Sequence, residues 1–527
     1  MIVRDGSQVQ KGLALLALLP ALWLTADAAA KTALPAGVVY VTQVEGVREY
    51  RLANGLQVLL FPDPSKPTTT VNITYRVGSR HENYGETGMA HLLEHLIFKG
   101  SRNFPNPDKE FTRRGFRNNG TTWLDRTNYF STFQASDDNL RWALAWKADA
   151  MVNSFIAKKD LDSEMTVVRN EFEMGENDPG RVLFQRTLAT MFDWHAYGKP
   201  TIGNRSDIEN VRIENLRAFY RRYYQPDNAT LIVAGRFNPE RTLRWIADSF
   251  GRIPKPARTL PLQWTVEPTQ DGERMFVVRR QGAVQIVIAA YRVPSALHPD
   301  TDALAVAAEI LGNTPNGRLH KELVQAGLAA QVFAYTLGTR DPGAILFGAV
   351  VKQGDAIERA RERLVEVVER TFLQTAPTSE ELARVRRDVA NQYERLLAQP
   401  EDFAVALSEY IALGDWRLFF LARDRMMAVE ASAVRDVAYR YFRRDNRTVG
   451  TFVPEDQPQR AEIPAAPSPQ QRLAEFKPRT AMAAGETFDP SQENIDRRTR
   501  RVTIGELKLA LLPKKTRGET VHVAMNF

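Results

Sequence analysis

The pair of histidines in the segment His91-Leu-Leu-Glu-His95 limits how this chain can fold more than any other feature. On an α-helix, residues four apart project from one face about one turn apart, so both imidazoles can reach one tetrahedral zinc ion. Glu94 points into the same space, where a general base would take a proton from zinc-bound water. The flanks Gly88-Met-Ala and Leu96-Ile-Phe-Lys-Gly100 make this helix apolar, and two imidazoles are costly there without a ligand or partner. The sequence therefore predicts a metal site on a largely apolar helix.

The alternative is that His91 and His95 are ordinary polar residues of an amphipathic helix. The histidine spacing argues against this alternative, because the chain has seven histidines (positions 81, 91, 95, 195, 298, 320 and 522) and no other two share this helical spacing. The order H-x-x-E-H is also the inverted form of the H-E-x-x-H motif of zinc peptidases. The motif thus favours metal-assisted hydrolysis over a purely structural helix.

Beyond the motif, the chain resembles the pitrilysin/insulinase family of zinc metallopeptidases, and in particular the N-terminal half of a long four-domain bacterial member. The family pattern runs from a glycine-containing approach into H-x-x-E-H and then to a helix with two glutamates. Here these segments are Gly85-Glu-Thr-Gly-Met-Ala-His91 and Glu164-Met-Thr-Val-Val-Arg-Asn-Glu171. The resemblance implies that Glu171, 171 − 95 = 76 residues after the second histidine, is the third ligand of one zinc ion beside His91 and His95.

The other glutamate of that helix, Glu164, lies two helical turns before Glu171 on the same face. It matches the second glutamate of the family, and we count it with Glu94 among the catalytic residues, in a role that supports the metal ligands. The alternative is a solvated glutamate on the surface of the helix.

A further motif resembles the family strand written N-A-x-T-x-x-D-x-T-x-Y, which borders the active-site cleft. In this chain it is Asn119-Gly-Thr-Thr-Trp-Leu-Asp125-Arg-Thr127-Asn-Tyr129. An extended substrate could add to the edge of such a strand through backbone hydrogen bonds, so Asn119, Gly120 and Thr121 are the candidate substrate-binding residues. Gly120 stands where the family has alanine, which makes the strand more flexible.

The composition excludes several other classes of protein. The formal net charge is only +7 over 527 residues, with Lys and Arg interspersed among Asp and Glu, so we expect no nucleic-acid partner. Cysteine is absent, which excludes thiol catalysis, cysteine-ligated zinc and disulfides. The expected partner is therefore the peptide substrate that the resemblance implies.

Residues 1–30 have the features of a secretory signal peptide. Arg4 and Lys11 flank the start, an apolar run extends from Gly12 to Thr25, and small residues offer cleavage sites after Ala28 or Ala30. The run is shorter than the roughly 20 residues that span a bilayer, so we expect cleavage and no stable membrane span afterwards. An exported chain without disulfides indicates a bacterial periplasm, with full secretion as the alternative.

The fold class expected from the resemblance is α+β, with two homologous metallopeptidase domains that form half of a clamshell. Each domain would be an antiparallel-rich sheet packed with helices. The first, catalytic and zinc-binding, spans residues 38–260 and includes two further family segments, residues 197–203 and 224–235. Its predicted elements are strands at 50–61, 69–77 and 229–234 and helices at 140–155, 160–176 and 213–223.

The second domain, residues 265–455, repeats this order. Tyr291-Arg-Val293 matches Tyr75-Arg-Val77, and a helix is predicted at residues 300–311. At the position of the H-x-x-E-H motif the repeat has Ala307-Ala-Glu309, which cannot bind zinc alone. We therefore expect a non-catalytic repeat domain.

The C-terminal region predicts a linker and the start of a third repeat. The linker, residues 456–495, is rich in Pro, Ala and Gln. In residues 496–527, Leu507–Pro513 resembles Leu56–Pro62 and Val521–Phe527 falls on Val71–Val77, as in the opening hairpin of a truncated domain. A fortuitous pair of strands is the alternative.

The family commonly holds the substrate backbone with an Arg and a Tyr from a later domain. Residues 316–322 and 327–330 resemble the segment that carries this pair in two-domain partners, but Ala330 stands where the tyrosine would be, although Arg318 is in place. We therefore expect a second half or a partner subunit to supply the substrate clamp.

Two functions remain. The favoured one is a zinc-dependent endopeptidase that hydrolyses peptides or unfolded segments, with Glu94 activating a zinc-bound water. The alternative is a non-catalytic structural or assembly subunit of the same fold.

Overall fold

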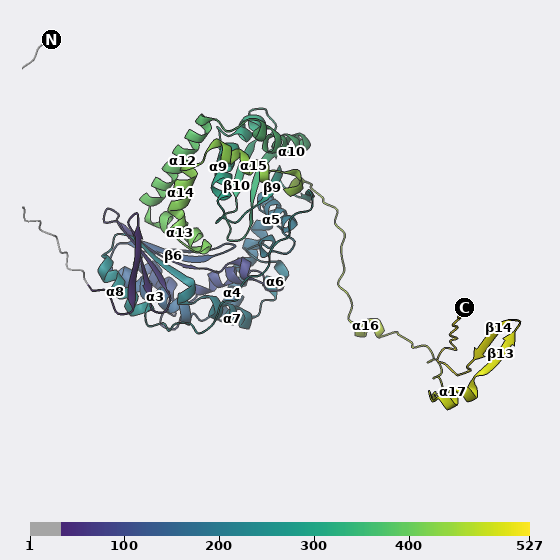
Figure 1. The fold of residues 1–527 in the computed structure, drawn as a ribbon. Coiled ribbons are helices and arrows are strands. Elements are labelled where there is room, and N and C mark those ends of the chain that lie inside the picture. Colours follow the sequence, from purple (N-terminus) through teal and green to yellow (C-terminus); the bar gives the residue numbers. More distant parts are fainter. Residues whose placement is uncertain (1–32) are drawn as a thin grey trace, which may run out of the picture. The chain divides into compact units, whose positions relative to one another are not determined.

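The protein, as a computed structural model, is described over residues 33–527 and falls into two units, residues up to 458 and residues 459–527. The first unit contains two large sheets covered by helices, and the second contains a short hairpin (Figure 1). The strands of the first sheet are β1 (Val38–Val44), β2 (Val47–Leu52), β3 (Gln57–Pro62), β4 (Thr68–Tyr75), β5 (Arg117–Thr122), β6 (Thr127–Gln134) and β7 (Ala229–Gly235). Those of the second sheet are β8 (Arg274–Arg280), β9 (Val284–Val293), β10 (Gln331–Thr336), β11 (Gly343–Lys352) and β12 (Arg447–Pro454).

The first sheet has the strand order β1-β2-β3-β7-β4-β6-β5, and β3 and β7 are its parallel neighbours. Strand β7 is buried along its whole length, as expected for an apolar, β-branched run with a strand on each side. One face of the sheet shares a core with helices α1 (Met89–Ile97), α3 (Asp137–Asn153), α7 (Ile213–Tyr223) and α8 (Pro239–Phe250). Helix α4 (Lys158–Glu176) packs against α1, and α1 itself lies against β5 and β6. The motif helix is thus placed beside the edge of the sheet.

The second sheet repeats the topology of the first. Its order is β10-β11-β9-β12-β8, with β8 and β12 parallel. In reverse this order corresponds strand for strand to β3-β7-β4-β6-β5, and the parallel pair falls at the same place. Tyr75 and Tyr291 lie in the corresponding central strands β4 and β9. The predicted α+β fold of two homologous halves, each a mostly antiparallel sheet with helices, is therefore confirmed.

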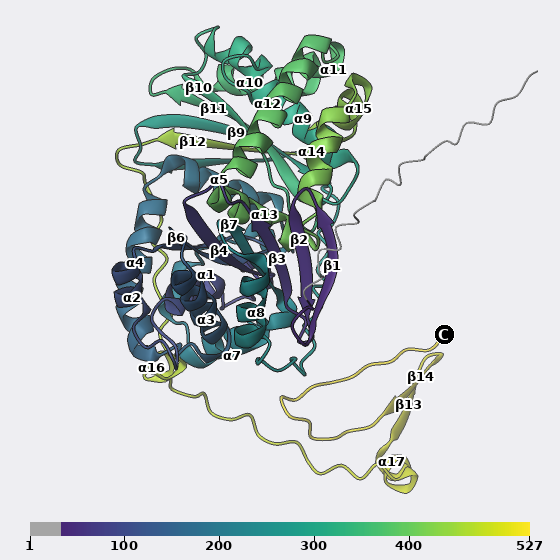
Figure 2. The ribbon, with the colours of Figure 1, turned by 90° about the vertical axis from the view of Figure 1, so that its left-hand side faces the viewer.

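Each sheet is covered on its other face by a helix from the opposite half of the sequence. Helix α5 (Pro179–Met191) packs on β8, β9 and β12 of the second sheet. Helix α13 (Pro400–Leu413) packs on β4, β6 and β7 of the first, where the Asn72 side chain donates to the Ala404 carbonyl at 2.7 Å. Figure 2 shows both helices between the two sheets. Because neither sheet can bury this face without the other half, the two halves form one compact unit.

The predicted single strand at residues 50–61 is wrong. The chain forms two antiparallel strands there, β2 and β3, because it turns at Gly55, which has φ +99°. A Cβ at Gly55 would also lie 3.0 Å from Asp227 Cβ, so this tight turn favours glycine.

The second unit contains helices α16 (Pro469–Leu473) and α17 (Gln492–Arg498) and a hairpin of β13 (Arg500–Ile504) and β14 (Leu507–Leu511). The predicted pairing of residues 507–513 with residues 521–527 is wrong, because the latter form no strand in the described structure. A two-residue turn with Gly505 at φ +60° instead pairs β14 with the segment just before it. The described sheet of residues 459–527 consists of β13 and β14 alone, whereas β4 of the first sheet pairs with β6 and β7.

Residues 33–527 contain no helix that is long and apolar enough to cross a membrane. The predicted signal peptide, residues 1–30, lies outside the described residues.

Candidate metal centre

Helix α1, which carries the H-x-x-E-H motif, begins at a tightly packed turn. The Glu82 carboxyl group accepts hydrogen bonds from the Gly88 and Ala90 N–H groups, each at 2.8 Å, and so caps the helix. Gly88 has φ +92°, and a Cβ there would lie 2.6 Å from the Ile202 carbonyl oxygen. The family segment at residues 197–203 therefore helps to position the motif helix.

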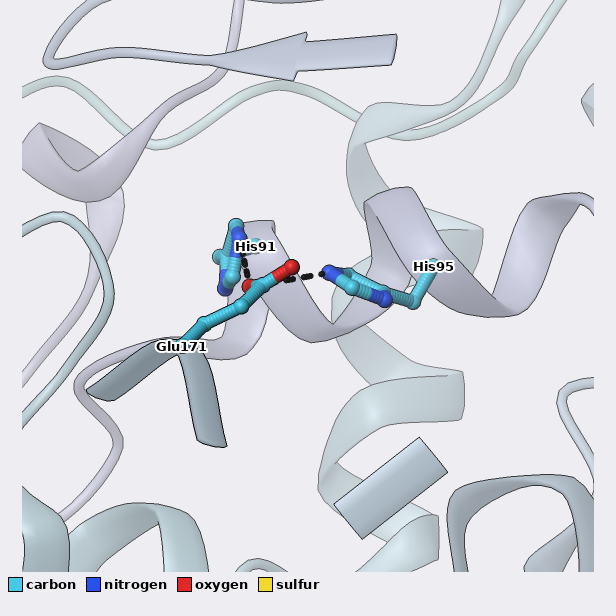
Figure 3. A group of neighbouring side chains, drawn as sticks. All are labelled: His91, His95 and Glu171. Atoms are coloured by element: carbon cyan, nitrogen blue, oxygen red, sulfur yellow. Dashed lines mark ion pairs between the residues drawn. The ribbon is translucent and has the colours of Figure 1, made fainter. Parts of the chain in front are cut away.

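The side chains of His91 and His95 on α1 and of Glu171 on α4 converge on one point (Figure 3). Glu171 Oε2 lies 3.5 Å from His91 Nε2 and 3.6 Å from His95 Nε2, and the three candidate ligand atoms lie within 4.8 Å of one another. Tetrahedral zinc with ligand bonds of about 2.0–2.2 Å places its ligand atoms about 3.3–3.6 Å apart. The three groups therefore fit a zinc ion with little movement and leave a fourth position for water or substrate.

The surroundings of His91 favour the neutral ring that metal binding needs. Burial, with a smaller contribution from His95, lowers the pKa of His91 to about 4. Its Nδ1 is buried without a hydrogen-bond partner among the described residues. Packing therefore holds the Nδ1 side of the ring, and Nε2 is the nitrogen that faces Glu171 and is available to a metal ion.

Glu164 contacts His95 on the side away from the converging ligand atoms. Its Oε2 lies 3.1 Å from His95 Nδ1, and its Oε1 lies 2.5 Å from Lys99 Nζ. Burial alone would raise the pKa of Glu164, but the hydrogen bonds from Lys99 and His95 outweigh it and lower the pKa. A carboxylate on Nδ1 holds the proton there and leaves Nε2 of His95 available to a metal. The Glu164 side chain is buried rather than solvated.

Strand β5 orients Glu94. The Thr122 hydroxyl donates to Glu94 Oε2 at 2.6 Å. Burial raises the pKa of Glu94, although this hydrogen bond acts to lower it. A Cβ on Gly120 would lie 2.8 Å from Glu94 Cγ, so the glycine leaves room for the glutamate as well as making the strand flexible.

The candidate substrate-binding residues Asn119, Gly120 and Thr121 lie on β5, at the edge of the first sheet. Among the described residues β5 pairs with β6 alone, so the other side of its backbone can accept an added strand. The Gly120 N–H donates to the Asn119 side chain at 3.0 Å. Because Thr122 contacts Glu94, a peptide on this edge would pass beside the glutamate.

Tyr197 of the first half and Arg340 of the second half hold the turn that follows β5, and the sequence alone did not predict this contact. Asp125 is buried and accepts hydrogen bonds from the Tyr197 hydroxyl at 2.9 Å and the Arg340 N–H at 3.0 Å. Arg80 Nε donates to Asp341 at 2.6 Å beside it. Asp125 is the aspartate of the family motif at residues 119–129, so the sequence singled it out. Its contact with Arg340 follows only from the packing of the two halves.

Arg318, which the resemblance suggests as part of a substrate clamp, is occupied elsewhere. Its guanidinium donates to Glu381 at 2.7 Å and to the Thr375 carbonyl at 2.7 Å, and its side chain is 10% exposed. It cannot hold a substrate in this arrangement.

Two family matches cover the part of the chain that contains these features. Residues 57–205 match Insulinase (Peptidase family M16), and residues 210–389 match the Peptidase M16 inactive domain. The first match includes all three converging side chains, and the second includes most of the repeat that lacks them. The chain belongs to the M16 insulinase family.

Its relatives include the zinc protease PqqE of Helicobacter pylori, to which it is 29% identical over 409 residues, 76% of this chain and 91% of the relative. The crystal structure of a protease from Helicobacter pylori superimposes with a TM-score of 0.74 at 28% identity, covering 77% of this chain and 99% of that one. The first half of the periplasmic protease PqqL from Escherichia coli shares the fold, with a TM-score of 0.64 at 18% identity over 79% of this chain and 94% of that one. The chain is thus a protein of peptidase fold whose relatives are named zinc proteases.

Proposed function

We propose that this protein is a zinc-dependent endopeptidase that hydrolyses peptides or unfolded segments. The observation that carries the proposal is the convergence of His91, His95 and Glu171 within 4.8 Å of one another, next to Glu94 and the sheet edge β5. The zinc-protease names of its relatives support the same activity.

The chemistry follows from the positions of the side chains. His91, His95 and Glu171 would hold one zinc ion, which when bound polarises the scissile carbonyl and the attacking water. Glu94 takes the proton from that water and delivers it to the leaving nitrogen, while Thr122 keeps its carboxyl group oriented. The substrate backbone adds to β5, which places the peptide bond beside Glu94.

The test combines metal analysis with cleavage of an unstructured peptide. We expect the wild type to bind one zinc per chain and to cleave the peptide. The nearly isosteric Glu94→Gln variant should keep zinc and lose cleavage, because an amide cannot accept the proton. Wild-type protein that neither binds zinc nor cleaves would support the alternative, a structural or assembly subunit.

We also propose that a second half or a partner subunit supplies the substrate clamp. The support is that Arg318 is engaged by Glu381, and that position 330 is alanine. Cleavage measured over a range of protein concentrations, with and without candidate partners co-expressed from the same genome, tests this proposal. Full activity of the monomer with no gain from any partner would refute it.

The proposed location is the periplasm or the medium, after removal of residues 1–30. The support is the signal-like sequence and the fold shared with a protease described as periplasmic. Cell fractionation and the mass of the mature N-terminus test it.

A further inference from the structure

Trp123, the residue that follows β5, lines two cavities of the first unit. The smaller, about 380 Å³, is lined by Glu171 and by Phe184 of α5, so it adjoins the candidate metal centre. The larger, about 750 Å³, is an open hollow lined by α9 (Asp300–Gly312), β10, α12 (Ser379–Ala398), α13 and α14 (Leu418–Ala428). The larger cavity therefore lies at the end of β5, since Trp123 follows this strand and Arg126, which also lines the cavity, donates to the Thr121 carbonyl of β5 at 3.0 Å.

The larger cavity has the size and lining of a binding site rather than of a packing defect. Its volume falls within the range of about 300–1,000 Å³ that ligand sites occupy. Three large apolar side chains that line it, Leu297, Tyr335 and Leu421, are 51%, 45% and 44% exposed. Apolar surface that gathers around one hollow is typical of an interaction site.

The charged side chains in the cavity wall give no preference for a charged ligand. Arg126 and Glu409 form an ion pair, with Arg126 Nε 2.9 Å from Glu409 Oε1. Asp302 of α9 and Arg425 of α14 also carry opposite charges. The charges of these four side chains sum to zero, so the wall has no excess of one sign that would select a charged guest.

We propose that this cavity binds a large aliphatic or aromatic side chain of the peptide whose backbone lies along β5, and so selects substrates by a residue at a set distance from the cleaved bond. The proposal rests on the endopeptidase function above. Trp123 separates the bond that is cut from the side chain that is recognised, so the cavity would serve long peptides and remain empty with short ones.

Binding measured on the Glu94→Gln protein tests the proposal without cleavage. The probes are fluorescein-labelled unstructured peptides of one length, in which a single Phe moves through a Ser- and Gln-rich sequence on either side of a fixed central bond. We expect one register to bind about tenfold more tightly than the others, since burial of a Phe side chain contributes that much or more. Equal affinity in every register would overturn the proposal.

Variants of α14 assign the effect to the cavity. Ala422 lines it, whereas Ala428 on the same helix is exposed and does not. In the Glu94→Gln background, Ala422→Phe should abolish the preference for Phe while Ala428→Phe retains it. Ala305→Phe, which fills the cavity from α9, should act like Ala422→Phe. A preference that survives both filling variants would refute the assignment.

Cleavage by the otherwise wild-type enzyme separates this inference from the proposed function. We expect wild type to cleave a long peptide with Phe in the bound register faster than a short peptide that ends before it, and Ala428→Phe to keep this difference. Register-dependent binding without any cleavage would refute the peptidase but keep the cavity site. Cleavage without register-dependent binding would support the peptidase and refute the cavity site.

Discussion

Glu164→Gln tests whether the carboxylate on His95 supports metal binding. Glu164 uses both oxygens, one 3.1 Å from His95 Nδ1 and one 2.5 Å from Lys99 Nζ. A glutamine can accept from His95 with its oxygen, but its NH2 group then faces the Lys99 ammonium, donor against donor. Loss of such a supporting partner typically weakens metal affinity by about 10–100-fold, or about 1.4–2.7 kcal/mol. We expect the variant to fold and to bind zinc with an affinity reduced by that factor.

The measurement is a competition titration of purified protein against a chromogenic zinc chelator. Glu173→Gln is the matched control, because Glu173 lies exposed on the same helix and should leave the zinc affinity unchanged. Affinity of Glu164→Gln within twofold of the control would show that the contact with His95 does not support the metal. Complete loss of zinc with retained folding would instead make Glu164 a ligand.

Three further predictions follow from the described contacts. His91→Ala and Glu171→Gln should each lose zinc in metal analysis, and full occupancy in either variant would exclude that residue as a ligand. Glu94→Gln should keep zinc while peptide hydrolysis falls by about 10²–10⁴-fold, and near-wild-type turnover would assign the general base to another group. Burial lowers the pKa of Lys147 to about 7, so above that pH the unfolded chain binds more protons than the folded one, and stability should rise with pH. Between about pH 7 and pH 9 the rise from this residue is about 2 kcal/mol, and urea unfolding of Lys147→Met should lack it.

The sequence by itself determined the features that depend on neighbours along the chain. The helical spacing of His91 and His95 is local, and so is the periodicity that predicted helices at residues 160–176 and 300–311, close to α4 and α9. The match between Tyr75 and Tyr291 likewise revealed two related sheets, because a repeated fold leaves a repeated pattern of strands. Hydrophobic periodicity and spacing carry this information without any knowledge of the packing.

Only the tertiary structure decided which distant groups meet. Spacing alone does not bring Glu171 to the histidines, whereas the packing of α4 on α1 does. In the sequence, Glu171 stands out as a ligand only through the family resemblance. The exchange of α5 and α13 between the sheets, and the contact of Asp125 with position 340, have no local signature, since each depends on how one half buries its apolar face against the other. The pairing of residues 507–513 was predicted wrongly for a related reason, since residues 507–511 pair with β13 and not with residues 521–527. A short-range turn at Gly505 competes with a longer pairing, and the described sheet of residues 459–527 consists of β13 and β14 alone.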